Sequence, residues 1–148
     1  MPTKIEEAKF VQLAKLERLA HANELIRIIG SYGRRFFWNS EHGRFAYFEM
    51  RLGRVYLIDD YTGKAIYTHR TGFANRWRGF SHGGTLRSLV EDMRDYIMTG
   101  QQIVRGRIVL GQLGRDGLEG NIWGYAADEA AKVRELAYAL PIIAPEAT

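Results

Sequence analysis

The feature that most constrains the fold is a run of 25 residues, Ile5–Ile29, that contains neither glycine nor proline. Alanine, leucine, glutamate, lysine and arginine, all strong helix formers, dominate it. Its apolar residues fall near helical spacing: Leu13, Leu16, Ala20, Ile26 and Ile29. Gly30 followed by Ser31 is the predicted end of the helix. The run predicts a long amphipathic helix whose main role is core packing. Because 25 residues is long for a small domain, a homodimer contact through this N-terminal helix is the alternative.

After Gly33 the pattern changes to short β-rich runs divided by turn residues. Four strands are predicted, at Arg35–Trp38, Arg44–Arg51, Arg54–Asp59 and Lys64–Arg70. Short connections join antiparallel neighbours, so we expect a meander. Apolar side chains alternate onto both of its faces, so the sheet needs cover on both sides or exposes rings that bind a partner.

The rest of the chain predicts two further helices. Thr85 is a candidate N-cap for a helix that ends near Gly100, Ile103–Leu110 is a candidate fifth strand, a glycine-rich loop covers 111–124, and a last helix runs from Ala126 to Leu140 before Pro141. The expected fold class is α+β, an antiparallel meander of four to five strands packed with a long N-terminal helix and two C-terminal helices. We expect one domain over residues 1–148, divided into 1–33 (helix), 34–70 (meander), 71–84 (basic, aromatic loop), 85–100 (helix), 101–124 (strand and loop) and 125–141 (helix).

Composition narrows the function classes. The absence of cysteine excludes disulfide scaffolds, thiolate zinc sites, iron–sulfur clusters and cysteine nucleophiles. Four of the first nine residues are charged, which argues against an N-terminal signal peptide: Lys4, Glu6, Glu7 and Lys9. The composition, with 46% apolar and 26% charged residues, argues against a membrane span. We therefore expect a cytoplasmic protein, with no membrane partner and no cofactor.

The net charge of +4 is unevenly distributed. Residues 34–78 hold nine basic and four acidic side chains, whereas residues 79–148 hold seven basic and nine acidic ones. The same 34–78 segment holds 11 of the 18 aromatic residues, and 16 of the 21 basic residues are arginines. Because arginine binds phosphate or carboxylate through two bonds and stacks on rings, this composition is typical of a recognition surface.

The first candidate site is the loop and helix start from Arg76 to Arg87. Its glycines let the backbone approach a ligand, and a helix N-terminus favours an anion. The set predicted to bind an anion or partner is Arg76, Trp77, Arg78, His82, Gly83, Gly84, Thr85 and Arg87. A helix entry with solvated arginines is the alternative interpretation, and the lysine of a phosphate-binding Walker loop is absent.

The second candidate site is one face of the meander, with Arg44, Tyr47, Arg54, Tyr56, Tyr67 and Arg70 as its predicted binding residues. Arginine and aromatic side chains anchor protein interfaces, and they also bind single-stranded nucleic acid by stacking. A protein-binding face and a nucleic-acid-binding face both remain open, although no RNA-binding signature is present.

A catalytic role is the third hypothesis. The chain has four histidines, and His69 or His82 with a carboxylate such as Asp59 or Asp60 would supply acid–base chemistry. No catalytic or metal-binding motif supports this hypothesis, so no catalytic and no metal residue is predicted. Asp59 and Asp60 precede a Thr-Gly turn, where carboxylates commonly cap backbone groups.

Two stretches, Asp59–Gly63 and Trp77–Leu86, resemble small accessory proteins of tailed phages and prophages. The resemblance covers about residues 34–100. It implies a protein that inhibits host enzymes or bacterial defence systems, as anti-CRISPR proteins do. Many such inhibitors are acidic mimics of DNA, whereas the basic face here attracts nucleic acid or an acidic partner surface. We therefore expect a non-enzymatic protein that binds a host or defence protein, with nucleic-acid binding as the alternative.

Overall fold

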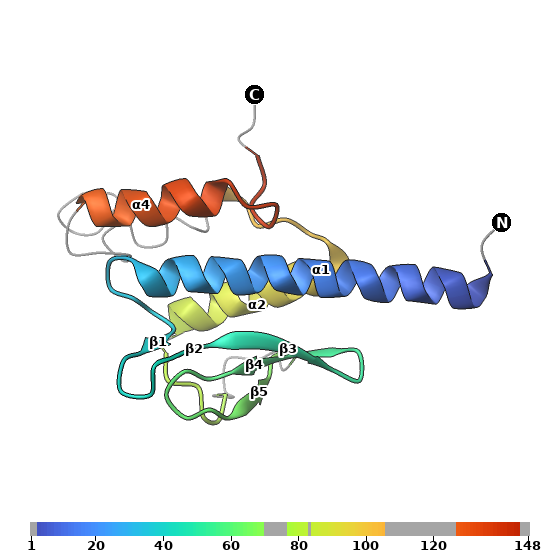
Figure 1. The fold of residues 1–148 in the computed structure, drawn as a ribbon, viewed down its shortest axis with the longest axis horizontal. Helices are drawn as coiled ribbons and strands as arrows, with labels where there is room; N and C mark the ends of the chain where they lie inside the picture. The colour runs from blue at the N-terminus through green and yellow to red at the C-terminus, as the bar shows by residue number, and fades with distance from the viewer. Residues whose placement is uncertain (1–2, 70–76, 83, 106–126, 146–148) are drawn as a thin grey trace.

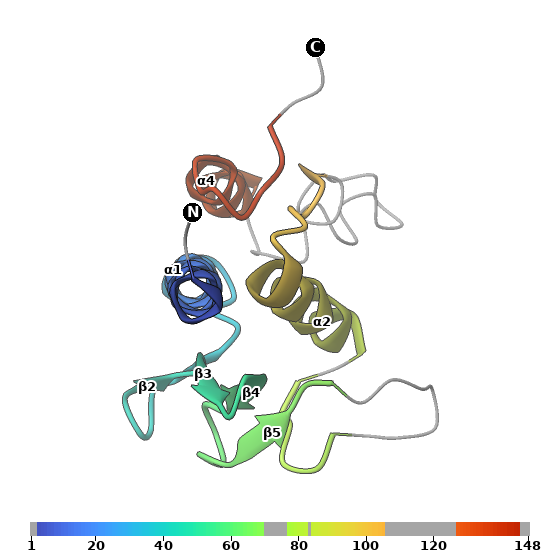
Figure 2. The ribbon, with the colours of Figure 1, turned by 90° about the vertical axis from the view of Figure 1, so that its right-hand side faces the viewer.

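The computed structural model describes residues 3–69, 77–82, 84–105 and 127–145. Its helices are α1 (Lys4–Ser31), α2 (Gly84–Thr99) and α4 (Ala127–Tyr138). Its strands are β1 (Trp38–Asn39), β2 (Arg44–Phe45), β3 (Tyr47–Arg51), β4 (Arg54–Ile58) and β5 (Ala65–Tyr67). Helices α1 and α2 lie between the strands on one side and α4 on the other, as Figures 1 and 2 show. This arrangement confirms the α+β class.

Helix α1 begins with the capping box of Thr3 and Glu6, whose side chains bond each other's backbone N–H groups. Only its second half is buried, from Ala22 to Gly30. The first half extends beyond the other elements (Figure 1), and its large apolar side chains are exposed. Leu13 and Leu16, predicted to pack in the core, are 62% and 43% exposed, so the prediction of a core-facing helix is correct for its second half only.

The strands form two separate antiparallel sheets. A short hairpin pairs β1 with β2, each of which is two residues long, and a three-stranded sheet has the order β3-β4-β5. The first predicted strand, Arg35–Trp38, is mostly wrong, because the backbone turns at 35–37 and pairing begins only at Trp38. Arg35 and Phe37 have positive φ angles of 54° and 66°, which no strand accommodates.

The inner face of the three-stranded sheet builds the core with α1 and α2. Phe48, Val55, Leu57 and Ile66 are buried there. The Asn23 side chain joins α1 to β3, because it accepts from the Phe48 N–H at 2.6 Å and donates to the Phe48 carbonyl at 3.2 Å. The sheet is thereby fixed to the helix by hydrogen bonds as well as by apolar packing.

The predicted C-terminal helices match α2 and α4 to within one or two residues. Of the predicted fifth strand, Ile103 makes a parallel bridge with Ile143, and its backbone bonds to Ile142 and Ala144. Residues 106–110 and the predicted glycine-rich loop lie outside the described residues. Among the described helices, none combines the length and apolar character that crossing a bilayer requires.

Candidate functional site: a basic, aromatic cleft

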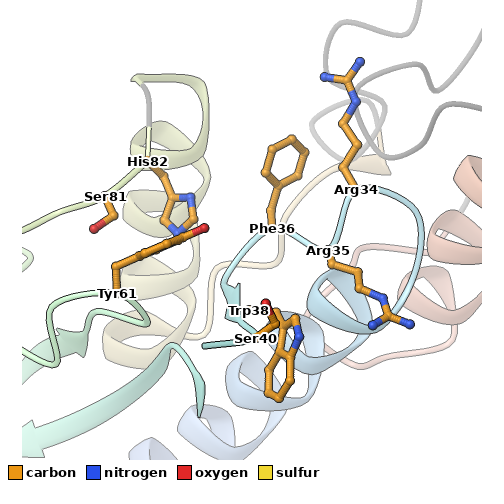
Figure 3. A pocket seen from close by; sticks show the side chains of 8 residues that line it. All are labelled: Arg34, Arg35, Phe36, Trp38, Ser40, Tyr61, Ser81 and His82. Carbon is orange, nitrogen blue, oxygen red and sulfur yellow. The ribbon is translucent and has the colours of Figure 1, made fainter. Parts of the chain in front are cut away.

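A cleft of about 640 Å³ lies where the α1–β1 connection faces the turn after β4. One wall consists of Tyr61, Ser81 and His82, and the opposite wall of Arg34, Arg35, Phe36, Trp38 and Ser40. Figure 3 shows Tyr61 and His82 side by side, with Phe36 across from them and the guanidinium groups beyond Phe36. The lining therefore combines rings, hydroxyls and cations.

The first wall is held by the buried carboxylate of Asp59, at the start of the β4–β5 turn. Asp59 accepts hydrogen bonds from the Tyr61, Thr62 and Ser81 N–H groups at 2.9 Å each. The hydroxyls of Thr62 and Ser81 donate to it as well. Burial raises the pKa of Asp59, but the bonds from Thr62, Ser81 and Tyr61 outweigh it and lower the pKa below its ordinary value. One side chain thus fastens the 77–82 segment to the turn.

His82 is fastened to the same turn by Asp60. Its Nε2 lies 2.7 Å from Asp60 Oδ1, and the Asp60 side chain is fully buried. A carboxylate can only accept, so Nε2 carries the proton and Nδ1 remains for another partner. Phe37 and Phe80 place ring edges against the imidazole, with centroids at 4.8 and 5.5 Å. The histidine ring is therefore held in one orientation at the wall of the cleft.

The opposite wall has an unfavourable backbone conformation. The positive φ angles at Arg35 and Phe37 are uncommon for residues with a side chain and cost about 1–3 kcal/mol each. Burial of the Phe37 ring and the hydrogen bond from Ala46 N–H to the Phe37 carbonyl, at 2.8 Å, hold the segment in place. The result is that Arg35 and Phe36 stand at the cleft instead of continuing a strand.

Asp59, Asp60 and His82 form a candidate metal-binding group, because their ligand atoms lie within 4.8 Å of one another. Five donors already occupy the oxygens of Asp59. Asp60 and His82 remain as possible metal ligands, and Asp60 Oδ2 is a buried oxygen without a hydrogen-bond partner. Two protein ligands are fewer than the three or four of a usual zinc site.

Among the described loop residues that were predicted to bind an anion or partner, only His82 lies at the cleft. Trp77 is buried, and the guanidinium of Arg87 lies over its ring at 4.7 Å while pairing with Glu91 at 3.3 Å. Arg78 borders a smaller pocket beside β5. Gly84 opens α2 and Thr85 follows it in the first turn. Arg76, Gly83 and the side chain of Thr85 lie outside the described residues.

The predicted sheet-face residues divide into two groups. Tyr47, Tyr56 and Tyr67 lie on the outer face, away from the helices, with Arg54 exposed at the β3–β4 turn. Arg44 instead donates to the carbonyls of Asp60 and Tyr61 at 2.9 and 3.0 Å, which supports the first wall of the cleft. Arg70 lies outside the described residues.

The two histidines proposed for acid–base chemistry have different surroundings. His69 Nε2 accepts a hydrogen bond from the Val55 N–H at 3.0 Å, at the edge of the sheet. Burial, followed by the charges of Arg94 and Arg54, lowers the pKa of His69 below its ordinary value. His69 therefore acts as a neutral acceptor for the backbone, whereas His82 faces the cleft.

Sequence reasoning predicted one residue of the cleft, His82, and missed the other seven lining residues: Arg34, Arg35, Phe36, Trp38, Ser40, Tyr61 and Ser81. The available signal is the run of basic and aromatic residues at Arg34–Trp38, but its β propensity predicts a strand over Arg35–Trp38 instead of a cleft wall. The two walls come from segments more than twenty residues apart, and periodicity does not reveal that they meet.

The fold and the cleft together define a small α+β protein with a basic, aromatic cleft. The chain belongs to the YoqU family, whose model matches residues 12–145. It is 34% identical over 123 residues to the SPbeta prophage-derived uncharacterized protein YoqU of Bacillus subtilis (strain 168), covering 83% of this chain and 80% of that protein. The phage context implied by the sequence resemblance is thereby confirmed: this is a family of prophage-derived small proteins. No solved structure matches the chain.

Proposed function

We propose that this protein is a phage accessory protein that acts in the cytoplasm of the bacterial host by binding and inhibiting a host or defence-system protein, in the manner of anti-CRISPR inhibitors. The observation that carries the proposal is the outer face of the three-stranded sheet. No described helix covers this face, whereas its inner face is packed against α1 and α2 (Figure 2). It exposes rings and arginines, the residue types that anchor protein interfaces.

Contacts among the outer-face residues support a preformed surface. Tyr56 and Tyr67 are cross-strand neighbours with ring centroids 5.5 Å apart. The Arg51 guanidinium lies over Tyr56 at 5.3 Å and pairs with Glu49 at 2.9 Å. Tyr47, at the other end of the face, is 44% exposed. Rings that already pack on one another lose little conformational freedom on binding, which favours a stable complex.

The net positive charge of residues 34–78 favours a partner with an acidic surface. The variant Tyr47→Ala/Arg54→Glu removes one ring and reverses one charge on this face. The control Lys132→Glu makes the same change of charge on exposed α4. After nuclease treatment of a host lysate, we expect the wild type and the control to retain the same bound protein and the double variant to lose it. The activity of the captured protein should then fall when purified wild type is added.

Retention of the same protein by the double variant would reject this face as the binding surface. An empty capture, or a captured protein whose activity is unchanged, would reject the proposed inhibition.

Nucleic-acid binding is the second candidate, favoured by the row of rings formed by Tyr56, Tyr67 and His69, in which Tyr67 and His69 are 5.3 Å apart. Bases stack on such rings, and phosphate contacts make the affinity fall steeply with salt. If the protein shifts neither single-stranded nor double-stranded oligonucleotides at low salt, this candidate fails.

A further inference from the structure

The cleft between Tyr61 and Arg35 is separate from the outer sheet face and has a chemistry of its own. It is lined by two arginines and a histidine, and no carboxylate lines it within the described residues. Asp59 and Asp60 are buried behind the first wall and bonded within it. A ligand in the cleft therefore meets positive charge and hydrogen-bond donors, which selects an anion.

The rings indicate what else the ligand carries. Tyr61 is 52% exposed although it is a large aromatic residue, and its ring stands beside His82 with centroids 6.3 Å apart. Phe36 stands across the cleft (Figure 3), and Trp38 is anchored on Phe45 with centroids 4.5 Å apart. Aromatic surfaces left partly open on two walls fit a flat ring that stacks between them.

Groups on both walls of the cleft are held in fixed conformations. The φ angles of Arg35 and Phe37 place Arg35 and Phe36 at its edge at a cost in backbone energy, and such strain is concentrated at functional sites. Within the described part of the chain, the Arg35 side chain makes no hydrogen bond or ion pair. On the opposite wall, the buried Asp60 holds His82, whose own side chain is only 9% exposed, in a single orientation.

We propose that this cleft binds a free nucleotide, with the phosphate bound by Arg35 and the base stacked against Tyr61. A planar guanidinium binds phosphate through two parallel hydrogen bonds, and His82 offers a further polar contact. A volume of about 640 Å³ is within the range of small-ligand sites. This inference goes beyond the proposed function, because it concerns a different surface and a different class of ligand.

The test is calorimetric titration with each of the four ribonucleoside 5′-monophosphates, with adenosine and with ribose 5-phosphate. We expect at least one nucleotide to bind, and adenosine and ribose 5-phosphate each to bind at least about tenfold more weakly, since each lacks one of the two recognised parts. Arg35→Asn should weaken nucleotide binding about tenfold or more, and asparagine tolerates the positive φ at this position. Tyr61→Ala should weaken nucleotide binding but leave ribose 5-phosphate binding unchanged.

Lys132→Asn is the matched control, because it removes one positive charge from an exposed position on α4, away from both proposed binding surfaces. It should leave nucleotide binding unchanged, and the thermal melting of all variants is compared to show that they fold. Lack of binding by all four nucleotides at millimolar concentration would overturn the inference, as would an equal loss in Arg35→Asn and Lys132→Asn. Binding of a 5′-phosphorylated oligonucleotide without binding of any mononucleotide would overturn the assignment to a free nucleotide. None of these outcomes depends on capture of a partner protein.

Discussion

The buried carboxylate of Asp59 connects the turn after β4 to Ser81 at the first wall of the cleft. Replacing it by alanine leaves three backbone N–H groups, those of Tyr61, Thr62 and Ser81, without their acceptor. We expect Asp59→Ala to lower the free energy of unfolding by about 2–4 kcal/mol, measured by urea denaturation. Ser81→Ala removes only one hydroxyl donor and should cost less than about 1 kcal/mol. Equal losses in the two variants would contradict the central role of Asp59.

His69 makes the stability depend on pH. Its pKa is lowered from an ordinary 6.5 in the folded state, so below that value the unfolded chain binds more protons. The contribution of His69 is complete above about pH 6.5 and is lost as the pH falls through the folded-state pKa. His69→Gln keeps an acceptor for Val55 N–H and does not titrate. Between pH 7.5 and pH 5, which lie about one unit or more on either side of the ordinary histidine pKa, the melting temperature should fall less in His69→Gln than in wild type. An equal fall in both proteins would show that another group causes the pH dependence.

The sequence predicts the capping role of Asp59 but not the contact of Asp60 with His82. The Asp-Asp-Tyr-Thr-Gly turn indicates capping by carboxylates, and Asp59 does cap it. The partner of Asp60 is not predictable in the same way, because His82 lies 22 residues further along the chain. Turn chemistry is local, whereas the cleft depends on how segments that are distant in the sequence pack together.

The end of α1 depends on Gly30. A Cβ at this position would lie 2.7 Å from the Phe45 ring and 3.1 Å from the Phe36 carbonyl. Gly30→Ala should therefore lower the free energy of unfolding by about 1–3 kcal/mol, although alanine is the better helix former. Chemical denaturation of Gly30→Ala/Phe45→Leu tests the cause. With the smaller leucine at position 45, Gly30→Ala should lower the free energy of unfolding less than it does beside Phe45. An equal loss of unfolding free energy with either residue at position 45 would contradict this explanation.

Among the elements, helices are predicted better than strands. The C-terminal ends of α2 and α4 follow from Gly100 and Pro141, which act locally, whereas Thr85, the predicted N-cap of α2, lies inside its first turn. The predicted Arg35–Trp38 strand fails because Phe37 is buried in the core at a positive φ, so tertiary packing overrides β propensity. That same override creates one wall of the cleft, which explains why the fold class could be predicted and the site could not.

The charge segments predicted from the sequence correspond to separate regions of the molecule. The basic, aromatic segment builds both sheets and the two walls of the cleft, apart from Ser81 and His82. Helix α4, from the more acidic C-terminal part, lies on the far side of α1 and α2 (Figure 1). An acidic partner is therefore attracted to the sheet side of the molecule, where both proposed binding surfaces lie.

The first half of α1 bears on the oligomeric state of the protein, because it lacks the packing against other elements that normally stabilises a helix. Ile5, Phe10 and Leu13 are 71%, 67% and 62% exposed along a segment that extends past the other elements (Figure 1). We expect this segment to pair with a second copy, giving a homodimer in light scattering at micromolar concentration. Phe10→Glu/Leu13→Glu should be monomeric, whereas Gln12→Glu/Ala20→Glu adds the same charge at exposed positions without removing a large apolar side chain and should remain dimeric. A monomeric wild type, or dissociation of both double variants to the same extent, would show that apolar pairing of α1 does not hold two copies together.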